Sequence, residues 1–411
     1  MMLRRQSGTK APPPPERLPS QDKYSSKRVL PLLAAAVGCI VAASLILRTT
    51  MASALQTDNV VTCQDQHRLN GRAVPGTTLA DDGHCVRASS LDAGVCVEDA
   101  ADWRGIHRRR CLPSLAVIGA MKSGTTNIML YLQNHPQLRT SEDLIGWPQE
   151  SRYFSAAHDP EAAGRNWRFY LRKYPPATDG VLTFDKSPNY LLNPKIPSVL
   201  ASLMPSLKLL VCLRNPTSRA YSHFQHECRN GRIVQSKENV YRCKPNRKNC
   251  GERLSFPCAP EAFDALVTAQ LAGAPLDRCA WARGSGSGDS NVLPRGFYDC
   301  QLAPWFDRFP RSQLLALVFE DFVSSREATL EAVARVERFA GLQPFDYGRS
   351  ARVAAVERLY ALMPSRGGRY APMPPATRGA LDELYCAPNR ALSATLRRPL
   401  PWPCGDGGGA V

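Results

Sequence analysis

Residues 119–126, with the sequence GAMKSGTT, could bind a phosphate group. Glycines allow a ligand to approach the backbone closely, and amides at the start of a following helix can hold a phosphate. The segment differs from the nucleotide-triphosphate loop G-x-x-x-x-G-K-[ST], because its lysine precedes the second glycine. The alternative interpretation is a glycine-rich turn between a strand and a helix that has no function.

A second candidate phosphate site begins at Arg214, in the segment 214–222 with the sequence RNPTSRAYS. A guanidinium group together with the hydroxyl of Ser222 suits a phosphate dianion. Taken alone, the segment could equally contain an arginine that caps a helix and a buried serine. Two such segments, each directly after an apolar stretch, would rarely occur together by chance.

Both segments resemble motifs of the Golgi carbohydrate sulfotransferases. The first resembles the loop that binds the 5′-phosphosulfate of PAPS (3′-phosphoadenylyl sulfate), and the second resembles the 3′-phosphate motif. Further similarities place the chain near the heparan sulfate N- and 3-O-sulfotransferases and the N-acetylgalactosamine-4-sulfate 6-O-sulfotransferase. They lie at His135-Pro136, 185–190, 296–298, 305–310 and 385–392. The resemblance covers most of residues 112–404 and implies that PAPS is bound by Lys122, Ser123, Gly124, Thr125, Thr126, Arg214 and Ser222.

The resemblance also implies a catalytic base. The family has a lysine-glutamate-x-histidine-aromatic-phenylalanine segment, and residues 149–154 here read QESRYF. Glu150 is retained and would remove the proton from the acceptor hydroxyl. Gln149 and Arg152 replace the lysine and the histidine of the family pattern, so the resemblance does not carry over the substrate contacts of these two positions. A solvated surface carboxylate is the alternative for Glu150.

Two further residues match active-site positions of the family. Lys186 matches a lysine that lies near the base and the acceptor, and its alternative is a surface lysine. His226 matches an active-site histidine of the heparan N-sulfotransferases. It follows Ser222 by four residues, which places both on one face of a helix, whereas His223 faces elsewhere. A structural histidine is the alternative for His226.

The segment 365–370, SRGGRY, stands where the family has a lysine-glycine-arginine loop over the nucleotide. The implied nucleotide contacts are Arg366, Gly368, Arg369 and Tyr370, with Arg366 in place of the missing lysine. An ordinary glycine-rich surface loop is the alternative.

The elements that must position these residues follow from hydropathy. Apolar runs at 112–120, 206–213 and 314–319 predict buried strands, and helical spacing follows at 127–136, 214–227 and 327–339. Strands that alternate with helices predict an α/β fold with a parallel sheet covered on both faces. The resemblance implies the P-loop-like sheet of the PAPS-dependent sulfotransferases.

The chain divides into regions of different composition. We expect a basic, proline-rich cytosolic tail at 1–28, a transmembrane signal anchor at 29–47, a cysteine-containing stem at 48–110, the sulfotransferase domain at 111–404 and a flexible tail at 405–411. Within the domain, residues 228–292 break the strand–helix alternation. Residues 228–253 carry eight basic side chains and two acidic ones, which predicts a disulfide-braced basic insertion beside the active site.

The apolar stretch 29–47 contains no charged residue and is long enough to cross a bilayer. Seven basic residues against two acidic ones precede it, so the positive-inside rule places the rest of the chain in the lumen. Ala52-Ser53-Ala54 leaves a cleaved signal peptide as the alternative. Thirteen of the 14 cysteines follow the stretch, which is typical of disulfides in an oxidising compartment, and Cys212 in its apolar run is the candidate free thiol.

A formal net charge of +16 favours a polyanionic partner, and a luminal location makes an acidic polysaccharide more plausible than nucleic acid. The sequence therefore predicts a PAPS-dependent carbohydrate O-sulfotransferase on the Golgi membrane, with no metal and a glycosaminoglycan-type acceptor. Two alternatives stay open: a luminal nucleotide kinase, and a non-catalytic glycan-binding protein on the same fold.

Overall fold

The computed structural model describes residues 77–79, 85–87, 96–98, 109–141, 150–156, 159–235, 240–242, 252–255, 257–284, 291–361, 370–402 and 404. All of them belong to the unit Gly71–Val411. The predicted cytosolic tail, membrane anchor and C-terminal tail lie outside the described residues. Within the described ranges, no helix has both the length and the apolar composition that crossing a bilayer requires.

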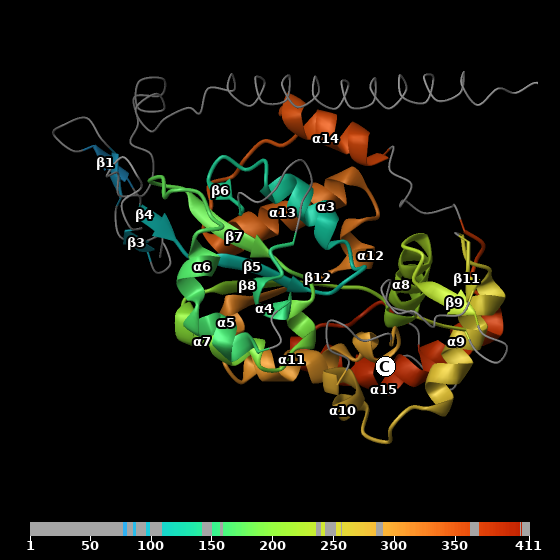
Figure 1. The fold of residues 1–411 in the computed structure, drawn as a ribbon. Helices are drawn as coiled ribbons and strands as arrows, with labels where there is room; N and C mark the ends of the chain where they lie inside the picture. The colour runs from blue at the N-terminus through green and yellow to red at the C-terminus, as the bar shows by residue number, and fades with distance from the viewer. Residues whose placement is uncertain are drawn as a thin grey trace, which may run out of the picture. The chain divides into compact units, whose positions relative to one another are not determined.

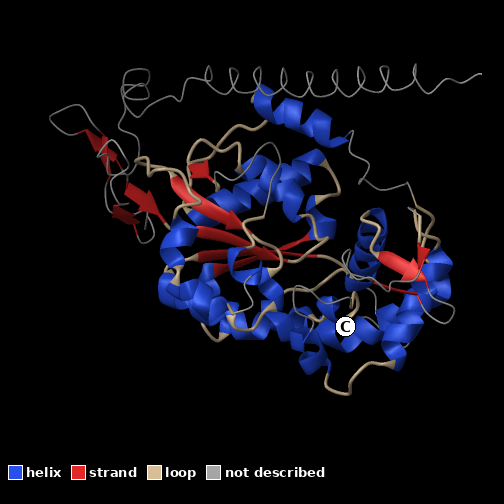
Figure 2. Ribbon diagram, viewed as in Figure 1, coloured by secondary structure: helices blue, strands red, loops and turns tan. Residues whose placement is uncertain are grey.

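A five-stranded sheet forms the centre of this unit (Figures 1 and 2). Its strands are β5 (Leu115–Gly119), β6 (Leu138–Arg139), β7 (Leu182–Lys186), β8 (Lys208–Leu213) and β12 (Leu314–Val318). They lie in the order β12-β8-β5-β7-β6, and every neighbouring pair is parallel. The predicted parallel sheet and its three apolar strands are therefore confirmed.

Helices cover both faces of the sheet, because alternate side chains of each strand point to opposite sides. Leu115 and Val117 pack with α3 (Thr125–Leu132) and α13 (Arg326–Ala340). Ala116 and Ile118 instead pack with α7 (Ile196–Leu203) and α11 (Tyr298–Phe306). Figure 1 shows these two pairs of helices on opposite faces of the sheet.

A second core joins helices beyond the sheet. It holds side chains of α8 (Pro216–Arg229), α9 (Pro260–Ala272), α10 (Arg278–Gly284) and α15 (Pro375–Leu396). The antiparallel sheet β10-β9-β11 accompanies them, with β9 at Ile233–Gln235, β10 at Val240–Arg242 and β11 at Glu252–Arg253. In the region 228–292, predicted as an insertion, the described residues thus form two helices and a small sheet.

The shorter elements complete the described structure. They are β1 (Thr77–Leu79), β2 (Cys85–Arg87), β3 (Cys96–Glu98), β4 (Arg109–Cys111), α4 (Tyr153–Ala156), α5 (Pro160–Arg165), α6 (Trp167–Leu171), α12 (Phe319–Phe322), α14 (Ala351–Ala361) and the 3₁₀ turns η1 (Tyr190–Leu192), η2 (Pro294–Gly296) and η3 (Arg311–Gln313). Strand β4 contains the expected boundary between stem and domain at 110/111. It pairs with β3 and is joined to it by the disulfide Cys96–Cys111.

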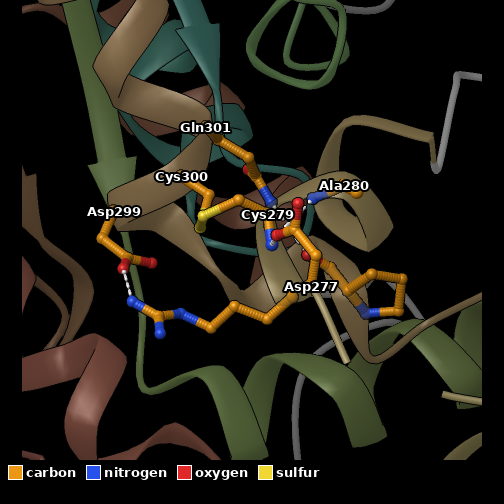
Figure 3. Close-up of a disulfide and its surroundings, with 8 residues drawn as sticks. Asp277, Cys279, Ala280, Asp299, Cys300 and Gln301 are labelled. Atoms are coloured by element: carbon orange, nitrogen blue, oxygen red, sulfur yellow. Dashed lines mark hydrogen bonds and ion pairs between the residues drawn. A yellow bond between two sulfur atoms is a disulfide. The ribbon is translucent and has the colours of Figure 1, made fainter. Parts of the chain in front are cut away.

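Four disulfides lie among the described residues, as the cysteine content predicts. Besides Cys96–Cys111 they are Cys228–Cys258, Cys279–Cys300 and Cys386–Cys404. Figure 3 shows how Cys279–Cys300 ties α10 to α11. Arg278, which precedes Cys279, forms an ion pair with Asp299 at 2.8 Å. Cys212 is buried and unpaired, as predicted, and burial raises the pKa of its thiol to about 12.

Candidate active site

A cavity of about 970 Å³ opens at the carboxyl end of the parallel sheet. Its lining includes Met121, Pro188, Arg214 and Phe319, which follow β5, β7, β8 and β12 in the chain. Parallel sheets bind ligands at this edge, because the loops that leave the strands meet there. The two predicted phosphate segments and Glu150 all contribute to the lining of this single cavity.

The loop after β5 has the geometry of an anion site. Gly124 has φ +80°, and a Cβ there would lie 2.7 Å from the Phe319 ring, so the position favours glycine. The loop leads into α3, and no side chain caps the start of this helix. The first amides of a helix have no partner within it, so they remain available to an anionic ligand.

The residues predicted to bind PAPS occupy different places in this loop. Lys122, Gly124, Thr125 and Thr126 line the cavity. The side chain of Ser123 is fully buried and is not part of the lining, while its amide donates to the carbonyl of Ala120 at 3.2 Å. Any contribution of Ser123 to ligand binding therefore comes through the backbone conformation of the loop.

Lys122 lies in a positively charged environment. Burial, together with the charges of Arg229 and Arg214, lowers the pKa of its ammonium group to about 8. The Arg214 Nη1 donates to the Lys122 carbonyl at 3.2 Å, so the two phosphate segments are in direct contact. An anion placed between these cations would reduce their mutual repulsion and favour the protonated form of Lys122.

Arg214 is held at the junction of β8 and α8. Its guanidinium carbon lies 4.4 Å from the centre of the Phe319 ring, and its Nε is buried without a hydrogen-bond partner. The next residue, Asn215, caps α8 by accepting from the Ser218 amide at 2.9 Å. A buried cationic side chain beside a cavity suits an anionic ligand, because this Nε–H is not used within the protein.

Helix α8 brings Ser222 and His226 to the same cavity, as their spacing predicts. The His226 Nε2 lies 3.2 Å from the Asn230 Nδ2. Burial and the charge of Lys122 lower the pKa of His226 to about 4, so its imidazole is neutral at pH 7. His223 is buried elsewhere, with its Nε2 3.7 Å from Glu227.

Glu150 lines the cavity and interacts with two cations. Its Oε1 accepts from the Lys186 Nζ at 3.0 Å, and its Oε2 accepts from the Arg152 Nε at 2.6 Å. Burial by itself would raise the pKa of Glu150, but Lys186 and Arg152 together hold the pKa below its ordinary value. Glu150 is therefore ionised at neutral pH and can accept a proton.

Lys186 is buried, with 4% of its surface exposed, which excludes the alternative of a surface lysine. It is the last residue of β7, whose sequence LTFDK lacks the apolar run of the other strands. The hydropathy pattern therefore does not reveal that this strand exists or that it ends at the active site.

The cavity contains residues that sequence reasoning missed. Tyr131, Arg326 and Glu357 form one wall, where Glu357 accepts from the Tyr131 hydroxyl at 2.6 Å and from the Arg326 Nε at 3.1 Å. The sequence predicts Phe319 only as the last residue of an apolar strand, whereas the strand ends at Val318 and Phe319 faces the cavity. Tyr370 lines the cavity as expected, whereas Gln149, Arg366, Gly368 and Arg369 lie outside the described residues.

Comparisons with known proteins identify similar sequences. No protein-family model matches the chain. The bifunctional heparan sulfate N-deacetylase/N-sulfotransferase 1 of Caenorhabditis elegans is 25% identical over 302 residues, which cover 71% of this chain and 30% of that protein. The human bifunctional heparan sulfate N-deacetylase/N-sulfotransferase 3 is 27% identical over 305 residues, covering 71% and 31%. The predicted resemblance to glycosaminoglycan sulfotransferases is thus confirmed, and the chain spans about 30% of the length of these homologues.

The comparison with solved structures finds sulfotransferases at low similarity. One from Alicyclobacillus acidocaldarius has a TM-score of 0.47 and 18% identity, covering 70% of this chain and 97% of that chain. A mouse sulfotransferase complexed with PAP has a TM-score of 0.39 and 14% identity, covering 69% and 88%.

Proposed function

We propose that this protein is a PAPS-dependent sulfotransferase that transfers a sulfuryl group to a hydroxyl of an acidic, glycosaminoglycan-type polysaccharide. The observation that carries the proposal is that Lys122, Arg214 and Glu150 line the same cavity. The first two suit a nucleotide with two phosphate groups, and the third can accept a proton. The homology to heparan sulfate N-deacetylase/N-sulfotransferases supports the same reaction class.

The donor side of the cavity fits PAPS. The buried and unsatisfied Nε of Arg214, with Ser222 on α8, suits the 3′-phosphate, and the loop at Gly124 with the first amides of α3 suits the 5′-phosphosulfate. PAPS supplies an activated sulfuryl group. In the reaction, Lys122 offsets the negative charge that develops on the bridging oxygen as the bond between this oxygen and sulfur breaks.

The acceptor side of the cavity supplies a proton acceptor. Glu150 removes the proton from the acceptor hydroxyl while the sugar oxygen forms its bond to sulfur, and adenosine 3′,5′-bisphosphate (PAP) leaves from the opposite side. Lys186 and Arg152 keep Glu150 ionised and fix both of its oxygens. Arg152 is also exposed enough, with 58% of its side chain accessible, to contact an acidic group on the acceptor.

We further propose that the protein is a single-pass type II protein of the Golgi membrane with a luminal catalytic domain. The charge-free apolar stretch 29–47 and the four disulfides of the described residues support this location. A tag at the C-terminus should resist protease in intact Golgi vesicles and become sensitive after detergent is added. Sensitivity in intact vesicles would contradict the luminal orientation.

Transfer of labelled sulfuryl groups tests the function. The full-length protein should label one or more members of a panel of desulfated glycosaminoglycans when the donor is PAPS, and should not consume ATP. The panel should include N-desulfated chains with free amines, because the names of the homologues describe N-sulfation, whereas we propose a hydroxyl acceptor. Nucleotide binding with no transfer to any acceptor would instead indicate a glycan-binding protein on a sulfotransferase fold.

A further inference from the structure

The carboxylate of Asp185 lies at the centre of a buried hydrogen-bond network that contacts the segment after Glu150. It is 1% exposed and accepts hydrogen bonds from four hydroxyl groups. These come from Tyr170 at 2.6 Å, Tyr190 at 2.8 Å, Ser187 at 2.9 Å and Ser151 at 3.1 Å. Three of these hydroxyls donate to Oδ2 and the Ser187 hydroxyl donates to Oδ1, so both oxygens of the carboxylate are engaged.

The donors in this network remain protonated. Burial is the largest effect on Tyr170 and Tyr190, and it raises their pKa values well above those of ordinary tyrosines. The charge of Asp185 raises these pKa values further. Burial also raises the pKa of Asp185, while the four hydroxyl donors oppose this rise. Burying a carboxylate whose only hydrogen-bond partners are neutral hydroxyls lowers the stability of the fold. A specific role in the protein can explain why such a network is present.

Two of the four donors connect Asp185 to the segment that carries Glu150. Ser151 directly follows Glu150, and its hydroxyl donates to the Asp185 Oδ2. Ser187 donates to the Asp185 Oδ1, and its hydroxyl in turn accepts from the Arg152 amide at 2.9 Å. Both residues that follow Glu150 are therefore fixed through this one carboxylate.

The backbone of this segment needs such support. Arg152 has φ +49°, a left-handed conformation that costs a residue with a side chain roughly 1–2 kcal/mol. Strained conformations of this kind persist only where their surroundings enforce them. With its backbone turned in this way, Arg152 directs its guanidinium back to the Glu150 carboxylate.

The adjacent residue on the same strand completes the arrangement. Successive side chains of a strand point to opposite faces, so Asp185 and Lys186 face different sides of β7. Asp185 lies among the tyrosines, whereas Lys186 reaches the Glu150 carboxylate at 3.0 Å. The end of β7 thus supplies both the ionic partner of Glu150 and the buried group that holds its backbone.

We infer that Asp185 is a positioning residue, which fixes the Glu150 carboxylate in the geometry needed for proton removal through Ser151 and through Ser187. This inference rests on the proposed role of Glu150 as the base. It assigns no contact with substrate to Asp185 itself.

The test compares variants of the full-length protein. Asp185→Asn keeps the shape but replaces one acceptor oxygen with a donor, so it cannot satisfy all four hydroxyls. A displacement of about 1 Å in a reacting group can cost on the order of 100-fold, and we expect kcat to fall about 10- to 100-fold. Affinity for PAP should not change, because Asp185 does not line the cavity.

The pH profile separates positioning from general loss of stability. Lys186 and Arg152 hold the pKa of Glu150 low, so a displaced Glu150 has a higher pKa, and the acid limb of kcat/KM should move to higher pH. Ser187→Ala, which removes only one of the two connections, should give a smaller shift in the same direction. It also keeps the test decisive if Asp185→Asn does not fold.

Tyr385→Phe is the matched control. The Tyr385 hydroxyl is also fully buried, but it donates to the Leu293 carbonyl at 2.7 Å and does not contact Asp185, Ser151 or Ser187. We expect a lower melting temperature with unchanged kcat and an unchanged acid limb. Wild-type kcat and acid limb in Ser187→Ala and in any folded Asp185→Asn, or an equal acid-limb shift in Tyr385→Phe, would overturn the inference.

Failure of the proposed function would give a different result. If the wild-type protein transfers no sulfuryl group to any acceptor, the reaction is wrong, but the position of Glu150 can still be measured. NMR titration of ¹³C-carboxyl-labelled glutamate, assigned with Glu150→Gln, reports its pKa without turnover. A rise of this pKa in Ser187→Ala supports the positioning role, and an unchanged pKa contradicts it.

Discussion

At the scale of single residues, the two cations of the cavity carry the nucleotide assignment. Lys122→Ala and Arg214→Ala should each weaken PAP binding, because each removes a charged hydrogen bond worth about 1.5–3 kcal/mol, or roughly 10- to 150-fold in Kd. Calorimetry measures the affinity. Arg338→Ala is the control, since Arg338 is exposed and pairs with Glu331 outside the cavity. Unchanged affinity in both cavity variants would contradict the assignment.

The lowered pKa of Lys122 makes nucleotide binding pH-dependent. In the free protein this pKa is about 8, and a bound phosphate favours the charged lysine. Affinity for PAP should therefore be nearly constant between about pH 7, where its phosphates are ionised, and pH 8, and should fall at higher pH. The slope should reach about one log unit of Kd per pH unit if a single proton is involved. Lys122→Arg should bind without this decline, because arginine keeps its charge. A wild-type affinity that stays flat to pH 10 would argue against contact between Lys122 and the anion.

Glu150 can be tested by a change that preserves shape. Glu150→Gln removes the proton acceptor and should lower sulfuryl transfer by about 10²- to 10⁴-fold, while PAP affinity stays close to wild type. Glu331→Gln, on the exposed face of α13, should retain full activity. If Glu150→Gln keeps activity within a few-fold of wild type, the base is another group.

At the scale of the element, the turn between β5 and α3 depends on Gly124. Gly124→Ala combines a left-handed backbone with a Cβ that would lie 2.7 Å from Phe319. Gly180→Ala is a matched control, because Gly180 also has a positive φ, of +73°, but has no atom within 4 Å of its added Cβ. In both variants the free energy of unfolding should fall by roughly 1–2 kcal/mol, because alanine is strained in a left-handed backbone conformation. Only Gly124→Ala should also weaken PAP binding, and equal PAP affinity in the two variants would show that the turn does not shape the site.

At the scale of the whole molecule, the positive charge is expected to recruit the acceptor. This prediction rests on sequence alone, because it concerns four residues of the basic insertion whose side chains lie outside the described part of the chain. They are Arg242, Lys244, Arg247 and Lys248. Neutralising all four should raise KM for an acidic polysaccharide and reduce its dependence on salt, since screening limits such fields to about 8 Å at physiological ionic strength. PAP affinity and the KM for a neutral oligosaccharide should not change.

A second quadruple variant controls for net charge. Arg308, Arg311, Arg338 and Arg349 are exposed and lie outside the insertion, so neutralising them removes the same charge from other surfaces. If both quadruple variants alter the salt response equally, the effect comes from net charge. A wild-type salt response in the insertion variant means that this segment is a solvated surface loop.

The sequence by itself determined the features that depend on local patterns. The apolar runs identify β5, β8 and β12, because strands of a parallel sheet are buried on both faces. The loop at Gly124 and the segment at Arg214 are also local, since each places its ligand groups within one turn between a strand and a helix. The buried thiol of Cys212 follows from the strand that contains it.

Only the tertiary structure decided which distant segments meet. Strand β7, LTFDK, owes its place to pairing with β5 on one side and β6 on the other, and not to its own hydropathy. Three contacts of the site join parts of the chain that no local pattern relates. They are the ion pair of Lys186 with Glu150, the packing of Arg214 on Phe319 and the hydrogen bond from Ser151 to Asp185. Disulfide connectivity is of the same kind. These contacts are selected by the packing of the whole sheet and its helices, because the free energy that fixes them comes from burial shared among many segments.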